Sequence, residues 1–525
     1  MSEVWLKRVV FFGLAGLLLK ASSFALFPTI DMWHEMSLFR EALTTGWIPR
    51  NDMFSYTPTI NPVVHHEWGS GALLYCITVA SKLGSAGLLI FKYALSAAIG
   101  ATCYVCARRH GASIPVFAFL SPLGILLEML GLTTIRAQVF TLLFLVVLLF
   151  LLEEDRRGQR WWIAAWLPIY VVWLNLHAGF LVGAGIFFLY ILERFLNELV
   201  NQNSIQHAFS QIRHLFIVGF AMSLLMMINP YGFDYLSYLW YATSLDRAPL
   251  IAEWCPLWQT PQLFFLLGAF AFSLLLLIYA ATRRELKKLP GLLFLLAAAW
   301  MALRHTRHIS IYAVIWVAYV PAYTEKTELV RLFWKLWRNR KSFLFMFWLA
   351  LGVIGVSLAI RDRFWQLRIP TTLAEEKEGV PIYPSGVINY LSDQKFTGNV
   401  MTPFYVGAYV SWKLYPKVKV SMDSRYEVAY PPEVVMENVE FYEAKDGWQK
   451  TLTRYSTDAI LVPRSSPLDQ LIEQSNQTTE GGKSITWRRV CVDDGFSLFM
   501  RSELADRFSV QDRTGEQIHD IFSRK

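Results

Sequence analysis

The sequence has few charged residues and few cysteines for its length. Asp, Glu, Lys and Arg make up 17% of its 525 residues, whereas soluble domains usually contain roughly 25%. Hydrophobic residues account for 54%, so the composition predicts a membrane protein with many spans and some soluble mass. The five cysteines show neither a disulfide framework nor a zinc-binding spacing. Cys103 and Cys106 form a C-x-x-C inside a hydrophobic run, where core packing is the favoured interpretation.

Several other signatures are missing from the sequence. It contains no internal repeat, no low-complexity tract and no glycine-rich phosphate-binding loop. The net charge of +8 comes mostly from basic residues in short loops between hydrophobic runs. This distribution is typical of membrane topology signals. We therefore expect the membrane, and no nucleic acid, among the partners.

The hydrophobic runs predict about eleven transmembrane helices. A span needs about 20 apolar residues, and the run at 69–82 is the shortest. If this run lies at the outer interface, the basic loops fall on the inner side, the N-terminus is cytoplasmic and the C-terminal region is extracytoplasmic, across a plasma (inner) membrane. The N-terminus itself reads as an uncleaved signal anchor. The remaining runs lie near residues 9–29, 86–106, 113–131, 138–153, 161–175, 179–197, 214–229, 263–282, 289–303, 308–322 and 342–360.

The pattern divides the chain into two regions. Residues 1–360 form the predicted transmembrane domain, with a first outer loop at 30–85. From 361 to 525 the hydrophobic runs shorten and charges return, which predicts a small α/β extracytoplasmic domain followed by a polar tail. Within it, residues 487–501 resemble a hairpin that turns at Asp493-Asp494-Gly495.

The most informative segment follows the first hydrophobic run. His34 and Glu35 follow Asp31 by three and four residues, so on a helix all three share one face. Ionisable groups at a membrane face are costly unless they line a wet cavity or take part in function. A carboxylate there could accept a proton from a hydroxyl, as a general base does. The alternative interpretation of Asp31 is an N-cap of an interfacial helix.

Further acids and imidazoles follow in the same loop. Asp52 precedes aromatic and hydroxyl residues, and its alternative role is an Asx turn. His65, His66 and Glu67 could bind a divalent metal together with Asp31 or Asp52, or could form a solvated loop end. A divalent metal is therefore a candidate cofactor, and its ligands are not assigned.

Arginines and small polar motifs mark the other predicted outer segments. Arg136, Arg304 and Arg307 could make bidentate contacts to a phosphate, or extend to lipid headgroups. His308 belongs to the same dense basic cluster as Arg304 and Arg307. Asn175 and His177 lie between two runs and could form part of a site or a turn.

These motifs together resemble the GT-C superfamily of membrane glycosyltransferases. The resemblance rests on a D-x-W-H…D-x-F-S-Y-T…H-E-W loop, a W-x-N-x-H-x-G-F element, a late R-H-x-R-H element and a D-x-R after a strand. The matching residues are Asp31, Trp33, His34, Asp52, Phe54, Ser55, Tyr56, Thr57, His66, Glu67, Trp68, Trp173, Asn175, His177, Gly179, Phe180, Arg304, Arg307, His308, Asp423 and Arg425. Two features differ: Met32 stands where many members have a second acid, and Arg136 lies where many have an acid in the second outer loop.

The resemblance implies an inverting transfer of a hexose from a polyprenyl-phosphate donor to a hydroxyl of a glycan, lipid or protein acceptor. In this interpretation Asp31, Glu35 and Asp52 are catalytic. The predicted substrate-binding residues are His34, His66, Glu67, Arg136, Asn175, His177, Arg304, Arg307 and His308. The rival hypotheses are a non-catalytic membrane scaffold and a transporter of a lipid-linked glycan.

Overall fold

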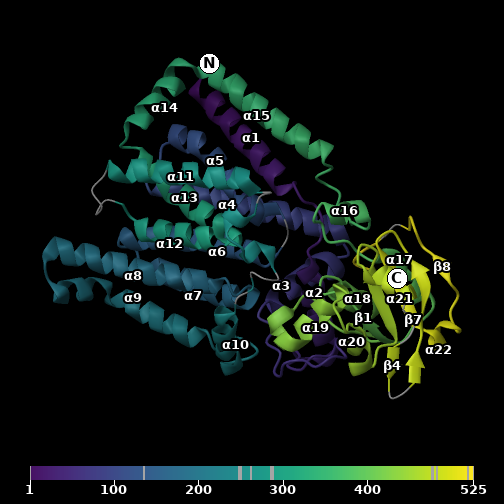
Figure 1. Cartoon of the computed structure of the whole chain (residues 1–525). Helices are drawn as coiled ribbons and strands as arrows, with labels where there is room; N and C mark the ends of the chain where they lie inside the picture. The colour runs from purple at the N-terminus through teal and green to yellow at the C-terminus, as the bar shows by residue number, and fades with distance from the viewer. Residues whose placement is uncertain are drawn as a thin grey trace. The chain divides into compact units, whose positions relative to one another are not determined.

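The computed structural model divides into two compact units (Figure 1). Unit 1 comprises residues 1–26, 89–232 and 243–366, and unit 2 comprises residues 27–88, 233–242 and 367–525. The structure describes residues 2–133, 136–245, 247, 251–260, 263–283, 289–474, 478–480, 483–516 and 520–523.

Unit 1 is helical, and a helix forms at each of the eleven runs predicted to be spans. Six of the described helices are long and apolar enough to cross a membrane: α4, α5, α8, α9, α11 and α15. The others fall short for two reasons. Helices α7, α12 and α13 have only 16, 13 and 16 residues, and α1 and α6 contain several charged residues. The bounds are α1 Glu3–Ser22, α4 Gly84–Arg109, α5 Ile114–Thr133, α6 Gln138–Arg156, α7 Trp161–Leu176, α8 Phe180–Gln202, α9 Ile205–Leu225, α11 Phe264–Thr282, α12 Leu292–Arg304, α13 Ile309–Thr324, α14 Glu328–Asn339 and α15 Lys341–Arg361.

Helix α13 forms the centre of unit 1, because every residue from Ile309 to Thr324 is buried. Helices α1 and α15 pack closely at glycines. A Cβ placed on Gly355 would lie 2.5 Å from the carbonyl oxygen of Gly16, so the two backbones approach as small residues permit in membrane helix pairs.

Unit 2 contains a six-stranded mixed sheet of order β2-β1-β3-β7-β6-β8. Strand β1 is parallel to β2 and β3, β7 is antiparallel to β3 and β6, and β8 is parallel to β6. The bounds are β1 Gly398–Met401, β2 Val418–Val420, β3 Ala459–Pro463, β6 Trp487–Val492, β7 Phe496–Arg501 and β8 Gln511–Asp512, with a separate hairpin of β4 Thr478–Glu480 and β5 Lys483–Ile485. The prediction of a C-terminal α/β region is therefore confirmed.

The C-terminal helices of unit 2 are α16 Leu373–Lys377, α17 Ser385–Asp393, α18 Gly407–Leu414, α19 Pro432–Tyr442, α20 Gln449–Arg454, α21 Leu468–Gln474 and α22 Ser502–Ala505, with a 3-10 turn η7 at Tyr426–Val428. The predicted hairpin joins β6 to β7, where Oδ1 of Asp493 accepts hydrogen bonds from the backbone N–H groups of Gly495 and Phe496. This side chain satisfies two backbone donors at the turn, as Asp commonly does.

The polar segment after α1 is part of unit 2. It forms α2 (Ile30–Thr45), a long loop at residues 46–67 that we call the polar loop, α3 (Trp68–Tyr75) and a π-helical turn η1 (Cys76–Ala80). Helix α10 (Phe233–Ser244) belongs to the same unit through its residues 233–242. The loop pairs with the edge of the sheet: Phe54 accepts a hydrogen bond from the Val420 N–H, and the Tyr56 N–H donates to Val420. Edge pairing of this kind fixes the register of the loop against β2.

Candidate functional site

Helix α2 carries the first predicted acidic cluster. Asp31 lies in the first turn, and the N-cap is Thr29, so Asp31 is not the cap. Trp33 Nε1 donates to the Tyr383 hydroxyl at 3.1 Å. That contact directs the Trp33 side of α2 into the aromatic interior of unit 2, while His34 and Glu35 line a pocket.

The pocket is small, and its empty space of about 250 Å³ includes open solvent. It brings together residues of α2 and of the loop end before α3, which lie about 30 positions apart in the sequence. Its lining consists of His34, Glu35, Leu38, His65, His66, Glu67, Trp68 and Val428.

Glu35 and Glu67 form a carboxyl pair in this pocket. The Glu35 residue is only 3% exposed. Burial, the charge of Glu67, a hydrogen bond to Glu67 and the charge of Asp31 all raise the pKa of Glu35 well above its usual range. Two carboxyl groups this close do not both ionise easily, which favours the protonated form of Glu35. Within the described part of the chain, Oε2 of Glu35 has no hydrogen-bond partner.

The adjacent histidines are held neutral. Burial lowers the pKa of His34 to about 4; the charge of Asp423 opposes that shift and the charge of Arg425 adds to it. Burial and the charge of Arg425 likewise lower the pKa of His65 well below its usual range. A neutral imidazole has one donor and one acceptor nitrogen, so these rings can hydrogen-bond a polar ligand without adding positive charge.

His66 forms one wall of the pocket. Its Nε2 lies 3.3 Å from Oε1 of Glu67, and its ring stacks on Tyr238 of α10 with a centroid distance of 5.0 Å. Asp234 of the same helix pairs with Arg50. These two contacts attach α10 to both ends of the polar loop.

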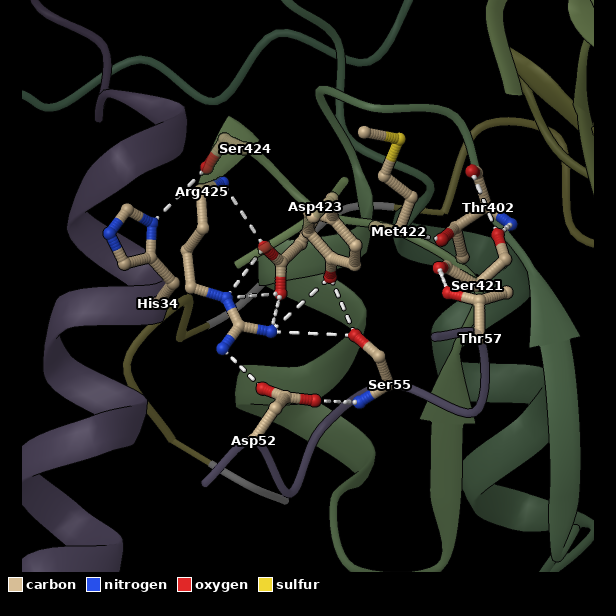
Figure 2. Close-up of polar contacts among 11 residues, drawn as sticks. His34, Asp52, Ser55, Thr57, Thr402, Ser421, Met422, Asp423, Ser424 and Arg425 are labelled. Atoms are coloured by element: carbon tan, nitrogen blue, oxygen red, sulfur yellow. Dashed lines mark hydrogen bonds and ion pairs between the residues drawn. The ribbon is translucent and has the colours of Figure 1, made fainter. Parts of the chain in front are cut away.

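Asp52 takes part in a buried ion-pair cluster beside the pocket (Figure 2). Arg425 donates to Asp423 through Nε and Nη2, both at 2.8 Å, and to Asp52 through Nη1. The second carboxylate oxygen of Asp52 accepts from the Ser55 N–H at 2.7 Å. The side chains of Arg425 and Asp52 are 1% and 2% exposed, so this geometry favours a positioning role for Asp52 over a catalytic one.

The same cluster reaches His34. Ser424 lies between the two members of the D-x-R motif, and its Oγ is 3.2 Å from Nδ1 of His34 (Figure 2). Burial raises the pKa of Asp423, but the Arg425 guanidinium outweighs burial, so this carboxyl titrates below its usual range. Asp423 and Arg425 are thus both charged at neutral pH, and their backbone turn positions the ring of His34.

Neither the protein-family models nor the curated proteins include a match to this chain. The proposed function therefore depends on the residues and their geometry.

The acids and histidines do not fit a metal centre. No group of three or more His, Cys, Asp or Glu side chains among the described residues has an arrangement that could hold a metal ion.

The predicted phosphate-binding arginines lie in unit 1, where two of them converge on one acid. Arg136 Nη1 is 2.5 Å from Oε2 of Glu253, and Arg307 Nη1 is 3.5 Å from its Oε1. Burial raises the pKa of Glu253, but both arginines outweigh it, and the net shift is downward. Arg307 and Arg247 also lie over the Trp254 ring, 4.6 and 4.9 Å from its centroid.

The third predicted arginine does not join this group. Arg304 is exposed and lies over the ring of Trp300, 5.9 Å from its centroid. His308 belongs to the turn η6 (Thr306–His308), and burial together with the charge of Arg307 lowers its pKa to about 3. The structure therefore brings Arg136, Arg307 and His308 together, whereas Arg304 lies over Trp300 and is not part of this group.

Asn175 and His177 make the bonds of a structural turn between α7 and α8. Asn175 Nδ2 donates to the carbonyl groups of Val171 and Ile228, both at 2.9 Å. His177 Nδ1 accepts from the Gly179 N–H at 3.0 Å. A Cβ on Gly179 would lie 2.1 Å from the Thr141 hydroxyl, so close packing requires glycine at this turn. The predicted role of both residues in substrate binding stays a prediction.

Three residues of the site were not predicted from the sequence. Tyr238, Val428 and Ser424 come from segments far from residues 30–68 and contribute to the pocket or its support. Ser424 had an indirect signal, because it lies inside the D-x-R motif. Tyr238 and Val428 had none, since an aromatic or aliphatic residue in a mixed segment is most often part of a core.

Proposed function

We propose that the protein is an integral-membrane glycosyltransferase that moves a sugar from a polyprenyl-phosphate donor to an acceptor hydroxyl. The observation that carries the proposal is the Glu35–Glu67 carboxyl pair, held in a small pocket beside neutral histidines. The pair follows the first apolar helix of a chain whose described residues include six candidate spans, which supports access to a lipid-linked substrate.

The transfer requires a single proton acceptor, which the carboxyl pair can supply. The acceptor oxygen forms a bond to the anomeric carbon, the bond from that carbon to the phosphate oxygen breaks, and polyprenyl phosphate leaves as an anion. The hydroxyl proton passes to a carboxylate. A phosphate needs no general acid to leave, unlike the alcohol leaving group of a glycosidase, which requires a second carboxyl with a separate role.

We assign the proton-accepting role to the group of Asp31, Glu35 and Glu67. Glu35 and Glu67 share one proton, so one carboxylate of the pair is available as a base. Asp31 acts on the pair through its charge, which raises the pKa of Glu35, and it remains the base that the resemblance implies. His34 and His65 would orient sugar hydroxyls.

The test is transfer by the purified full chain in lipid nanodiscs with a radiolabelled polyprenyl-phosphate hexose and a panel of glycan, lipid and peptide acceptors. General-base catalysis contributes about 10²–10⁴-fold, so at least one of Asp31→Asn, Glu35→Gln and Glu67→Gln should lose that factor. The matched control is Glu41→Gln, because Glu41 lies on α2, pairs with Arg40 and does not line the pocket.

Wild-type transfer in all three variants would refute the assignment of the pocket as the catalytic site. Absence of transfer and of donor binding by the wild-type protein would favour the scaffold hypothesis. A transporter would move the labelled lipid across the nanodisc or vesicle bilayer without forming product, so lipid movement measured in vesicles separates the third hypothesis.

A further inference from the structure

Helix α14 has a sequence that suits the surface of a membrane and not its interior. Residues 326–341 read KTELVRLFWKLWRNRK, with six basic residues and one acidic residue, Glu328. The apolar residues recur on one side of the helix, and Arg331, Lys335 and Arg338 fall on the opposite side at helical spacing. Helices that lie in the interface plane have this combination of a basic face and an aromatic and aliphatic face.

The apolar side of α14 is packed against unit 1. Val330 and Trp337 are buried, and the Phe333 ring stacks on Phe119 of α5 with a centroid distance of 4.7 Å. Leu332 on the flank remains 49% exposed. The helix is therefore docked along one side, and its flank has apolar surface available for lipid chains.

The neighbouring helices place α14 at a membrane surface. Helix α15 is a candidate span that begins at Lys341, directly after α14 ends at Asn339. Phe119 lies in the second turn of another candidate span, α5. Figure 1 shows α14 leading into α15 near the start of α1. A hydrogen bond and the charge of Lys7 lower the pKa of Glu3 in the first turn of α1, and the charges of Lys341 and Arg338 add to that shift. Span ends lie at headgroup level, so α14 lies there too.

The basic side of α14 is open to solvent. The Arg331 side chain is 81% exposed, and its ion-pair partner Glu328, at 2.6 Å, is 67% exposed. Such a pair contributes little in water and leaves the guanidinium able to bind a phosphate. Lys335 and Arg338 are also exposed, and Arg338 lies over the Trp334 ring, 5.2 Å from its centroid.

We propose that α14 binds the headgroups of anionic phospholipids through Arg331, Lys335 and Arg338. The phosphate and the net negative charge of the lipid complement the basic face, and the exposed Leu332 contacts the acyl chains. This proposal does not rest on the glycosyltransferase assignment, because it concerns unit 1 alone and requires no turnover.

The test measures lipid retention by the full chain in nanodiscs that contain equal amounts of phosphatidylglycerol and phosphatidylcholine. Native mass spectrometry of the protein released from the discs gives the ratio of the two lipids that stay bound. Each juxtamembrane cation strengthens binding to an anionic surface about fivefold. The variant Arg331→Gln/Lys335→Gln/Arg338→Gln should therefore lose about tenfold to hundredfold in phosphatidylglycerol preference.

Two further variants make the result specific. Arg331→Lys/Arg338→Lys preserves the charge and should retain the preference. Arg361→Gln/Arg363→Gln/Arg368→Gln removes the same charge from exposed residues at and just after the other end of α15 and should also retain it. Wild-type preference in the glutamine variant of α14, or an equal loss in the variant beyond α15, would overturn the proposal.

Discussion

Arg425 donates a hydrogen bond to Asp52, a residue 373 positions earlier in the chain, while it binds Asp423 through two further nitrogens. All three side chains are at most 2% exposed. This relationship joins the polar loop to the C-terminal sheet at the site where His34 meets Ser424, so the shape of the pocket depends on an ion pair outside it.

Removal of the Arg425 charge should unfold the loop. Arg425→Met leaves two carboxylates buried without a counter-charge, which costs about 3–5 kcal/mol. We expect a lower thermal transition and rapid proteolytic cleavage between residues 46 and 67. The control is Arg454→Met, because Arg454 pairs with Glu437 at the surface and is 60% exposed; loss of such a pair costs about 1 kcal/mol or less. Equal effects of the two substitutions would contradict the role assigned to the cluster.

Gly71 should be essential for the approach of α3 to α2. A Cβ at this position would lie 2.2 Å from the carbonyl oxygen of Glu35, so Gly71→Ala must separate the helices and move Glu67 away from Glu35. We expect a destabilisation of about 1–3 kcal/mol and a loss of transfer activity. Gly185→Ala is the matched control, because a Cβ there meets no atom within 4 Å. Full activity of the Gly71 variant would show that the two helices do not set the pocket.

The carboxyl pair predicts a definite pH dependence of stability. The folded-state pKa of Glu35 is raised, so the protonated group contributes stability that is fully present below its unfolded pKa of about 4.3 and is lost as the pH rises through the folded value. Relative to Glu35→Gln, the wild-type protein should therefore become progressively less stable over that window, by up to about 1.4 kcal/mol per pH unit. Thermal unfolding of both proteins as a function of pH checks this, and a constant difference across the range would contradict it.

The pairing of Arg136 and Arg307 with Glu253 predicts opposite effects of two substitutions on phosphate binding. Glu253 neutralises charge between Arg136 and Arg307, so Glu253→Gln should strengthen binding of polyprenyl phosphate and Arg307→Gln should weaken it about tenfold or more. Arg304→Gln should have a smaller effect, since Arg304 lies over Trp300 instead. Binding measured by native mass spectrometry distinguishes these outcomes. A loss of affinity in Glu253→Gln equal to that in Arg307→Gln would mean that the cluster is structural.

Hydrophobic periodicity determined the helical architecture. Runs of apolar residues predict helices well, because a backbone in lipid must satisfy its own hydrogen bonds. The same patterns did not determine how many helices have the length and composition of a span, since the ends of α1 and α6 are charged and α12 is short. The α/β character of the C-terminal region and its hairpin at Asp493 were also readable from local alternation and turn chemistry.

The presence of a functional segment at Asp31, His34, Glu35, His66 and Glu67 could be predicted from the sequence, because charge near a membrane is costly and these residues closely follow the first apolar run. Their partners could be identified in the folded chain alone: Glu35 pairs with Glu67, Asp52 is held by Arg425, and Arg136 and Arg307 meet at Glu253. Such pairings depend on which segments pack together over tens to hundreds of residues. The free energy of that packing is spread over many apolar contacts, so no single motif encodes it.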